Sequence, residues 1–221
     1  MEIKHIIWDW NGTLLDDTLA GMNAVNAMLT ARGMPPISLA RYRATFGFPV
    51  LDFYRSVGFR LDTEDWDAMA DEFHRNFLSD TTIRLHTHAV ATLVHVRSCG
   101  IGQSVLSASE QSILNNMLSE YGLAHFFTHV YGVDNLYGRS KLEIGRTLIK
   151  ALNSPPGSIL MIGDSLHDHE VARHLEIGCL LIAQGHQSRV RLSSSAAPVL
   201  DDLSELPGWL DGRAAAGAAP A

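Results

Sequence analysis

The chain contains 221 residues and has a formal net charge of −7, because 24 acidic residues outnumber 17 basic ones. Hydrophobic residues make up 46% of the chain and charged residues 19%, which is typical of a globular protein with a sizeable core. No block of Lys and Arg is long enough to follow a phosphate backbone, so a nucleic-acid partner is not expected. Two cysteines exclude a disulfide framework, and no apolar run approaches the roughly 18 residues that span a bilayer. We therefore expect a cytoplasmic protein that does not enter a membrane.

The first element predicted along the chain is a buried strand. Residues 3–8 form a short apolar, β-branched run that Asp9 closes, and the Asn11-Gly12 pair then turns the chain sharply. Similar strand-like runs recur at residues 101–106, 127–133, 159–162 and 179–183, and helical patterns separate the later of these runs. Strands that alternate with helices form parallel sheets. The sequence thus predicts an α/β, Rossmann-like core with helices on both faces of a parallel sheet.

A long stretch between the first and second strands, residues 16–87, shows helical periodicity and no convincing strand. Apolar residues at helical spacing begin at Leu19 and at Trp66, and Thr63 is placed to cap the second helix. We interpret this stretch as a small α-helical cap domain inserted into a discontinuous core of residues 1–15 and 88–212. The low-complexity residues 213–221 are expected to form a disordered tail.

Polar residues follow three predicted strands at their carboxyl ends, which is where ligands bind in an open parallel sheet. Residues 9–13 follow the first strand, residues 107–109 follow the second, and residues 163–168 follow the fourth. Lys141 opens the helix that precedes the fourth strand. A carboxylate pair, a hydroxyl and a lysine are the groups needed for phosphoryl transfer to an aspartate.

Two motifs in these segments are specific. The opening motif comprises Asp9, Gly12, Thr13, Leu14 and Asp16. The second comprises Gly163, Asp164, Ser165, Asp168 and Ala172. With the serine and lysine segments, they resemble the four motifs of the haloacid dehalogenase-like hydrolase superfamily over nearly the whole chain. The inserted helices resemble the cap of the phosphoglycolate phosphatase-like branch, and Asp16 is expected to anchor the hinge of this cap.

The resemblance implies a magnesium-dependent hydrolase of phosphate monoesters, in which Asp9 attacks phosphorus and forms an aspartyl-phosphate. It implies that Mg²⁺ is bound by Asp9, by the backbone carbonyl of Asn11 and by Asp164. Asp168 is expected either to support the metal or to position Lys141. Mg²⁺ suits an oxygen-rich site of this kind.

The phosphoryl group is expected to contact Ser107 and Lys141, which donate a hydrogen bond and neutralise negative charge. Further substrate contacts are expected from the turn after the nucleophile and from two other loops, at Trp10, Gly12, Thr13, Gly47 and Ala108. Ser107 with Glu110 also fits a capping box for the following helix, and both roles are compatible.

Substrate choice is expected to come from residues 46–49 of the cap, which resemble a loop that closes over the leaving group. Arg43 and Arg55 flank this loop and are placed to meet an acidic substrate tail, although a surface position fits each equally well. We expect a small phosphorylated metabolite as substrate and a monomer or homodimer. Residues 16–87 contain no lysine, which disfavours a phosphonate hydrolase, and Asn11 disfavours a phosphomutase.

Asn11 is where the sequence departs from the resemblance, because most phosphatases of the superfamily carry a second aspartate there. That carboxyl would act as general acid and base, which contributes about 10²–10⁴-fold, and an amide cannot do so. Three interpretations remain open: a good leaving group such as an acyl or aryl phosphate, a proton from His167 or the His86/His88 pair, or deamidation of Asn11 before Gly12. Asn11 also supports an alternative function, a catalytically weak or inactive protein that binds phosphate and metal in a regulatory role.

Overall fold

A six-stranded parallel sheet forms the centre of the protein, with the strand order β5-β4-β1-β6-β7-β8. The computed structural model describes residues 2–134 and 141–217, with the backbone alone for residues 214–217. The strands are β1 (His5–Trp8), β4 (Gly102–Glu110), β5 (His129–Val133), β6 (Ile159–Gly163), β7 (Gly178–Ile182) and β8 (Val199–Leu200). All but β8 lie where the sequence predicts strands, and β8 is too short to show a pattern. Chain order reverses beside β1, which favours a ligand site at its carboxyl end.

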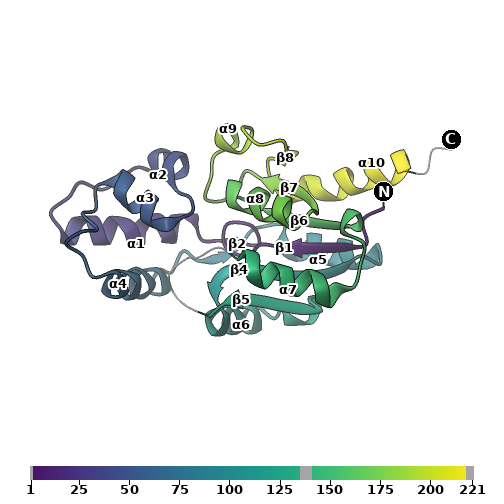
Figure 1. The fold of residues 1–221 in the computed structure, drawn as a ribbon, viewed down its shortest axis with the longest axis horizontal. Helices are drawn as coiled ribbons and strands as arrows, with labels where there is room; N and C mark the ends of the chain where they lie inside the picture. The colour runs from purple at the N-terminus through teal and green to yellow at the C-terminus, as the bar shows by residue number, and fades with distance from the viewer. Residues whose placement is uncertain (1, 135–140, 218–221) are drawn as a thin grey trace.

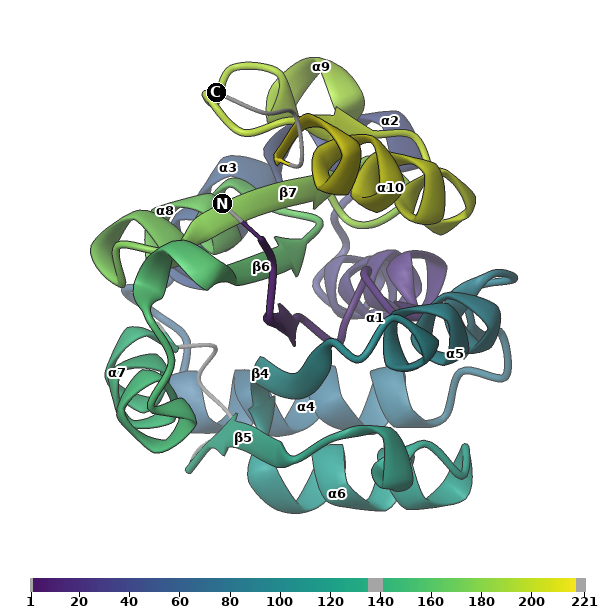
Figure 2. The same cartoon turned by 90° about the vertical axis from the view of Figure 1, so that its right-hand side faces the viewer.

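Helices cover both faces of the sheet, which confirms the predicted Rossmann-like α/β class (Figure 2). Helices α7 (Leu142–Leu152) and α8 (Leu166–His174) pack on one face, where they share a core with Ile7. Ile6 and Trp8 belong to the core on the other face, because successive side chains of a strand point to opposite faces. That face is covered by α5 (Ala89–Ser98), α6 (Gln111–Glu120) and α10 (Leu206–Gly217).

Four helices follow β2 (Leu15–Asp16) and precede β3 (Arg84–Leu85), where the sequence predicts the cap. They are α1 (Thr18–Ala31), α2 (Leu39–Thr45), α3 (Val50–Val57) and α4 (Trp66–Leu78). Figure 1 shows them together at the end of the molecule away from both termini. They have an apolar core of their own, which includes Met28, Tyr42 and Phe53. The exact division between cap and core stays a prediction.

The two short strands β2 and β3 pair antiparallel where the chain enters and leaves the four helices. Asp16 Oδ2 lies 2.8 Å from Arg84 Nη2 across this pair, which fits the expected hinge-anchoring role of Asp16. The predicted N-cap of α4 was wrong by two positions. Asp65, rather than Thr63, accepts backbone N–H groups of the first turn of α4.

The C-terminal helix corrects the prediction of a disordered tail from residue 213. Helix α10 continues to Gly217, and Leu206 and Leu210 near its start pack against the core of the sheet. Alanine has the highest helix propensity, so an alanine-rich segment extends a helix that packing has already started. Residues 218–221 lie outside the described residues.

The remaining elements are α9 (Arg189–Leu192), η1 (Ala124–Phe126), η2 (Pro156–Ser158) and η3 (Leu203–Glu205). Among all the helices within residues 2–134 and 141–217, none has the length and apolar character needed to cross a bilayer.

Candidate active site

Three buried aspartates meet at the carboxyl ends of β1 and β6. Asp9 directly follows β1, Asp164 directly follows β6, and Asp168 lies in the first turn of α8. One carboxylate oxygen from each lies within 4.8 Å of the other two. The structure therefore brings together the acidic side chains that the sequence predicts for the metal site.

Lys141, at the start of α7, contacts two of these carboxylates. Its Nζ lies 2.5 Å from Asp9 Oδ1 and 2.6 Å from Asp168 Oδ1, and only 2% of the side chain is exposed. Burial alone would lower the pKa of Lys141, but the charges of Asp168 and Asp9 raise it, so the ammonium stays charged. Lys141 is thus held beside the predicted nucleophile.

Asp168 uses both of its oxygens in contacts with protein groups. Oδ1 pairs with Lys141, while Oδ2 accepts hydrogen bonds from the backbone N–H and the hydroxyl of Ser165, at 3.0 and 2.7 Å. Burial tends to raise the pKa of Asp168, but Lys141 and Ser165 lower it. Of the two roles expected for Asp168, this geometry favours the positioning of Lys141.

The site carries more negative charge than its own cations neutralise. Burial, followed by the charge of Asp168, raises the pKa of Asp9 to about 8 although Lys141 opposes the shift. Burial, with a further contribution from Asp168, raises the pKa of Asp164 to about 7, against the charge of His186. A divalent cation among these oxygens would relieve the repulsion, so the residues present fit a metal ion.

Asp164 is held tightly by backbone on two sides. The N–H of His186 donates a hydrogen bond of 2.5 Å to Asp164 Oδ2. A methyl group at Gly12 or Gly185 would overlap the same oxygen, and Gly12 also has a positive φ of 72°. Both positions therefore require glycine if the carboxylate is to keep its place.

The amide of Asn11 is fixed at both ends. Its Nδ2 donates to Asp17 Oδ2 at 2.6 Å, and its Oδ1 accepts from Ser109 Oγ at 2.5 Å. The N–H of Gly12 donates to Asp17 Oδ1 at 2.7 Å. Deamidation needs the Gly12 nitrogen to attack the Asn11 side chain, and these three hydrogen bonds oppose that movement.

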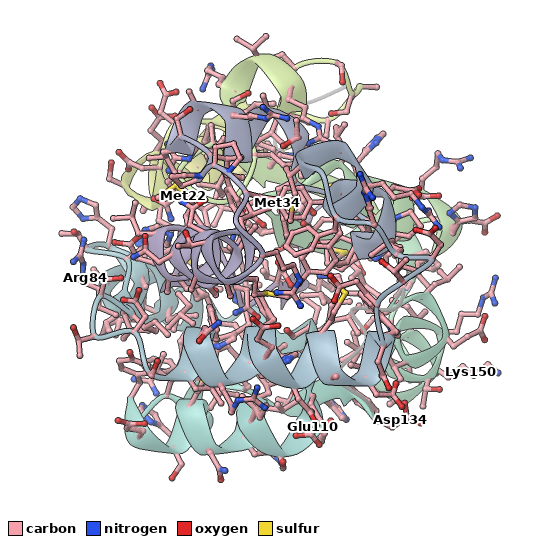
Figure 3. The ribbon with its side chains drawn as sticks, turned by 90° about the vertical axis from the view of Figure 1, so that its left-hand side faces the viewer. Met22, Met34, Arg84, Glu110, Asp134 and Lys150 are labelled. Carbon is pink, nitrogen blue, oxygen red and sulfur yellow. The ribbon has the colours of Figure 1, made fainter. Side chains whose placement is uncertain are left out.

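A cavity lies between the four cap helices and the carboxyl ends of the strands. Its volume is about 150 Å³, and it extends from Asp9 and Lys141 to the apolar side chains of the cap. Figure 3 views the molecule from the cap side, with Glu110, one of the lining residues, beside α4 and α6. Arg43 donates to the carbonyl of Gln184, and Arg55 pairs with Asp52 at the surface. The cavity-lining residues in the described part of the chain include neither arginine.

Comparison with known proteins decides the family. Residues 6–182 match the family model described as haloacid dehalogenase-like hydrolase. The chain belongs to the haloacid dehalogenase-like hydrolase family. The resemblance inferred from the two aspartate motifs is therefore confirmed, and the protein is a hydrolase.

Relatives and solved structures agree with this family. A phosphoglycolate phosphatase of Pseudomonas syringae pv. syringae is 26% identical over 219 residues, which cover 94% of this chain and 80% of the relative. A phosphoglycolate phosphatase of Neisseria meningitidis is also 26% identical, with coverage of 95% and 90%. The crystal structure described as a predicted phosphatase from Clostridium acetobutylicum has a TM-score of 0.81 at 19% identity, covering 96% of this chain and all of that one. The fold of haloacid dehalogenase-like hydrolases is thus shared over almost the whole chain.

Ser107 and Ala108, two further residues predicted from the haloacid dehalogenase-like motifs, line the cavity. Ser107 Oγ accepts the N–H of Ser109 at 3.0 Å, and its own hydroxyl proton can donate to a ligand. The alternative capping role of Ser107 is wrong, because Glu110 accepts the first free N–H groups of α6.

The other substrate contacts predicted for this haloacid dehalogenase-like hydrolase, at Trp10, Gly12, Thr13 and Gly47, are not among the described residues that line the cavity. Trp10 is fully buried in the core of the sheet, and its carbonyl accepts backbone N–H groups of the following turn. Gly12 and Thr13 form that turn. A methyl group at Gly47 would lie 2.9 Å from Arg191 Nη2, so this glycine gives room to an arginine.

Sequence reasoning missed Asp17 and His186, which both line the cavity. His186 Nε2 lies 3.1 Å from Asp17 Oδ1, and His186 Nδ1 lies 3.0 Å from the hydroxyl of Tyr42. Burial lowers the pKa of His186, but Asp17 outweighs it and raises the value to about 9; burial tends to raise the pKa of Asp17, and His186 lowers it. The two therefore form an ion pair. The available signals were the second of two adjacent aspartates and a histidine after Gly185.

The histidines that were predicted as proton sources occupy other places. His167 stacks on Phe48 with ring centroids 4.6 Å apart, and burial lowers its pKa. His86 Nε2 lies 3.1 Å from the carbonyl oxygen of Gly12, and His88 is exposed before α5. Within the described residues, His186 and His74 are the histidines that line the cavity.

Proposed function

We propose that the chain is a Mg²⁺-dependent phosphatase that hydrolyses a small phosphorylated metabolite through an aspartyl-phosphate on Asp9. One observation carries the proposal: Asp9 lies beside Lys141 and within ligand distance of two further carboxylates, at the bottom of a cavity under the cap. The relatives named phosphoglycolate phosphatase support hydrolysis of a phosphate ester.

Asp9 is placed to act as the nucleophile. Lys141 fixes one of its oxygens and compensates the charge of an approaching phosphoryl group. Asp9, Asp164 and the carbonyl of Asn11 are the groups that would hold Mg²⁺, which would neutralise charge on the phosphoryl oxygens. The hydroxyl of Ser107 donates a hydrogen bond to a phosphoryl oxygen from the neighbouring strand.

The cap excludes water from the reacting atoms. Phe46 and Phe48 come from the loop between α2 and α3, and both rings line the cavity. Gln187, in the loop after β7, donates to the carbonyl of Phe46 at 2.9 Å and accepts the N–H of Leu166 at 3.0 Å. The cap loop is thereby tied to the loop beside Asp164, and its opening would admit water for the second step.

A screen of phosphorylated metabolites with Mg²⁺ or with EDTA tests this function. We expect phosphate release from at least one small ester with Mg²⁺ and none with EDTA. The rival function is the regulatory protein without turnover, which Asn11 favours because it removes the usual acid–base carboxyl. Binding of Mg²⁺ and phosphate by calorimetry, with no release from any ester, would favour this rival. The cytoplasmic location and the monomeric or homodimeric state also stay predictions.

The metal-free protein is expected to lose stability as the pH rises from about 4 to about 8, and so to be less stable at pH 9 than at pH 6. Asp9 and Asp164, with pKa values of about 8 and 7, keep protons in the folded state that the unfolded chain has released near its ordinary pKa of about 3.9. Because the folded state binds more protons, stability falls as pH rises through the folded pKa values. Melting temperatures at pH 6 and at pH 9, each measured with EDTA and with Mg²⁺, report this loss of stability. Mg²⁺ should raise the melting temperature more at pH 9, and an equal gain at both would contradict the repulsion that we describe.

Gly185→Ala is expected to weaken Mg²⁺ binding without unfolding the protein. The added methyl group would overlap Asp164 Oδ2 and the backbone carbonyl oxygen of Gly12, and a change in a group that positions a metal ligand typically costs about 10–100-fold in metal affinity. Gly208→Ala is the matched control, since a methyl group at Gly208 meets nothing within 4 Å. Calorimetric titration with Mg²⁺ gives both dissociation constants. Equal values for the two variants would show that the position of Asp164 does not determine metal affinity.

A further inference from the structure

The cavity above Asp9 has aromatic walls. Its rings come from α2, from the α2–α3 loop, from α3 and from α4, and belong to Tyr42, Phe46, Phe48, Phe53, Tyr54, Trp66, Phe73 and Phe77. Ile113 and Met117 of α6 add an aliphatic side. The volume of about 150 Å³ includes the space beside Asp9 and Lys141 as well as the apolar part, and an engineered apolar cavity of about 150 Å³ binds benzene. The apolar part thus suits a small aromatic ring in size and in lining.

The basic side chains that line this cavity in the described part of the chain are Lys141, His186 and His74, and each already has a partner. Lys141 is the only lysine or arginine among the described lining residues, and it already pairs with Asp9 and Asp168. His186 pairs with Asp17, and His74 Nδ1 donates to the backbone carbonyl of Ala70 at 2.7 Å. A carboxylate on the leaving group would therefore lose its hydration without gaining an unpaired lysine or arginine among the described lining residues, which is costly in a buried site.

Two cap arginines, Arg32 and Arg43, bind other groups of the protein. Arg32 binds Glu64 and Glu72, with N–O distances of 2.6 and 2.8 Å. Arg43 donates to the backbone carbonyl of Gln184. Glu110 adds a carboxylate to the cavity wall. The lining groups of the described chain thus repel a second negative charge on the substrate.

The chemistry of Asn11 points to the same kind of leaving group. Its amide is held by Asp17 and Ser109 and has no proton to give to a departing alkoxide. A phenol has a pKa of about 10, far below the value of about 15.7 for water, so a phenolate leaves without prior protonation far more readily than an alkoxide does. Hydrolysis of an aryl phosphate therefore depends less on a general acid than hydrolysis of an alkyl phosphate does.

We propose that the substrate is a small aryl phosphate whose uncharged aromatic ring occupies the cavity between cap and sheet. The assignment rests on the proposed function. A carboxylate oxygen of Asp9 forms a bond to phosphorus while the bond from phosphorus to the aryl oxygen breaks. The electron pair leaves with the phenolate, which takes a proton from water. Water then attacks the aspartyl-phosphate and releases inorganic phosphate and the Asp9 carboxylate.

Three esters test the substrate class with the wild-type enzyme and Mg²⁺: phenyl phosphate, benzyl phosphate and 2-phosphoglycolate. Phenyl and benzyl phosphate both carry a ring, but only phenyl phosphate has a good leaving group. We expect kcat/KM for phenyl phosphate to exceed that for benzyl phosphate by about 10²–10⁴-fold, the usual contribution of a general acid. A value for 2-phosphoglycolate equal to or above that for phenyl phosphate would overturn the assignment. Equal values for the phenyl and benzyl esters would also overturn it, since the site would then supply a proton.

Two phosphonates separate recognition by the cavity from turnover. Phenylphosphonate carries the ring and phosphonoacetate carries a carboxylate, and neither is expected to be hydrolysed by this reaction. In the presence of Mg²⁺ we expect phenylphosphonate to bind at least about tenfold more tightly than phosphonoacetate, which corresponds to about 1.4 kcal/mol of binding free energy. Tighter binding of phosphonoacetate would overturn the assignment even if no ester were hydrolysed. If every ester were inert while phenylphosphonate bound tightly, the proposed hydrolysis would fail and the recognition of the ring would stand.

Val50→Arg should reverse this preference, because Val50 lines the cavity and a guanidinium there offers a partner to a carboxylate. Val190→Arg is the matched control, since Val190 is 87% exposed. If Val50→Arg does not fold, Phe48→Ala serves instead, with an expected loss of about tenfold in phenylphosphonate affinity and little change for phosphonoacetate. If the ratio of the affinities for phenylphosphonate and phosphonoacetate did not change in the folded variant, the assignment would be overturned. If a phosphotyrosyl peptide were hydrolysed faster than phenyl phosphate, the substrate would not be a small molecule.

Discussion

Asp9→Asn is expected to reduce phosphate release by about 10⁴-fold or more, because removal of a covalent nucleophile costs rates of this order. The amide has the shape of the carboxyl, but it is a far weaker nucleophile toward phosphorus. Initial rates with saturating ester and Mg²⁺ measure the effect. Asp211→Asn, at an exposed position of α10, is the control and should retain full activity.

The same variant is expected to keep its fold and to gain stability in EDTA. Burial and the charges of Asp168 and Asp164 raise the pKa of Asp9 to about 8, so a neutral amide removes both the cost of burying a charge and the repulsion. Thermal unfolding at about pH 9 measures this change. Undiminished turnover by a folded Asp9→Asn variant would exclude Asp9 as the nucleophile.

Lys141→Met is expected to destabilise the protein by about 3–5 kcal/mol, because it leaves the buried carboxylate of Asp168 without its partner and leaves Asp9 to take up a proton. Methionine keeps the length and apolar stem of the side chain, so the loss reports the charge. Urea unfolding in EDTA at about pH 8 measures the free energy. Lys150→Met in the same helix is the control, since Lys150 is exposed and lies at the edge of the molecule (Figure 3).

A second substitution shows whether the loss comes from unpaired charge. Asp168→Asn in the Lys141→Met background removes the carboxylate that has lost its partner and should recover part of the stability. Mg²⁺ should also recover part, since it binds the same oxygens. If Lys141→Met unfolded at the same urea concentration as Lys150→Met, the ion pairs around Lys141 would not hold the site together.

The sheet and the metal-site carboxylates could be predicted because local rules determine both. Apolar runs of strand length mark the core of a parallel sheet, and its strand ends meet at one edge. Asp9, Asp164 and Lys141 therefore converge although they are far apart in the chain. The motifs give the position of each residue after its strand, and the parallel pairing of the strands then brings the side chains together.

The remaining parts of the site depend on contacts that no local pattern encodes. Asp17 and His186 are 169 positions apart, and neither lies in a motif of recognised spacing. The pairing of Arg43 with a backbone carbonyl depends on how the cap sits on the loop after β7. The helical end of α10 likewise depends on Leu206 and Leu210 packing on the sheet, which composition does not show.

Detection of the covalent intermediate tests the central claim most directly. The enzyme is mixed with excess ester and Mg²⁺, quenched in acid within the first turnover, and mapped by peptide mass spectrometry. We expect a phosphoryl group on Asp9 that is absent from Asp9→Asn. A phosphoryl group on another residue, or steady turnover with Asp9 never modified, would contradict the account.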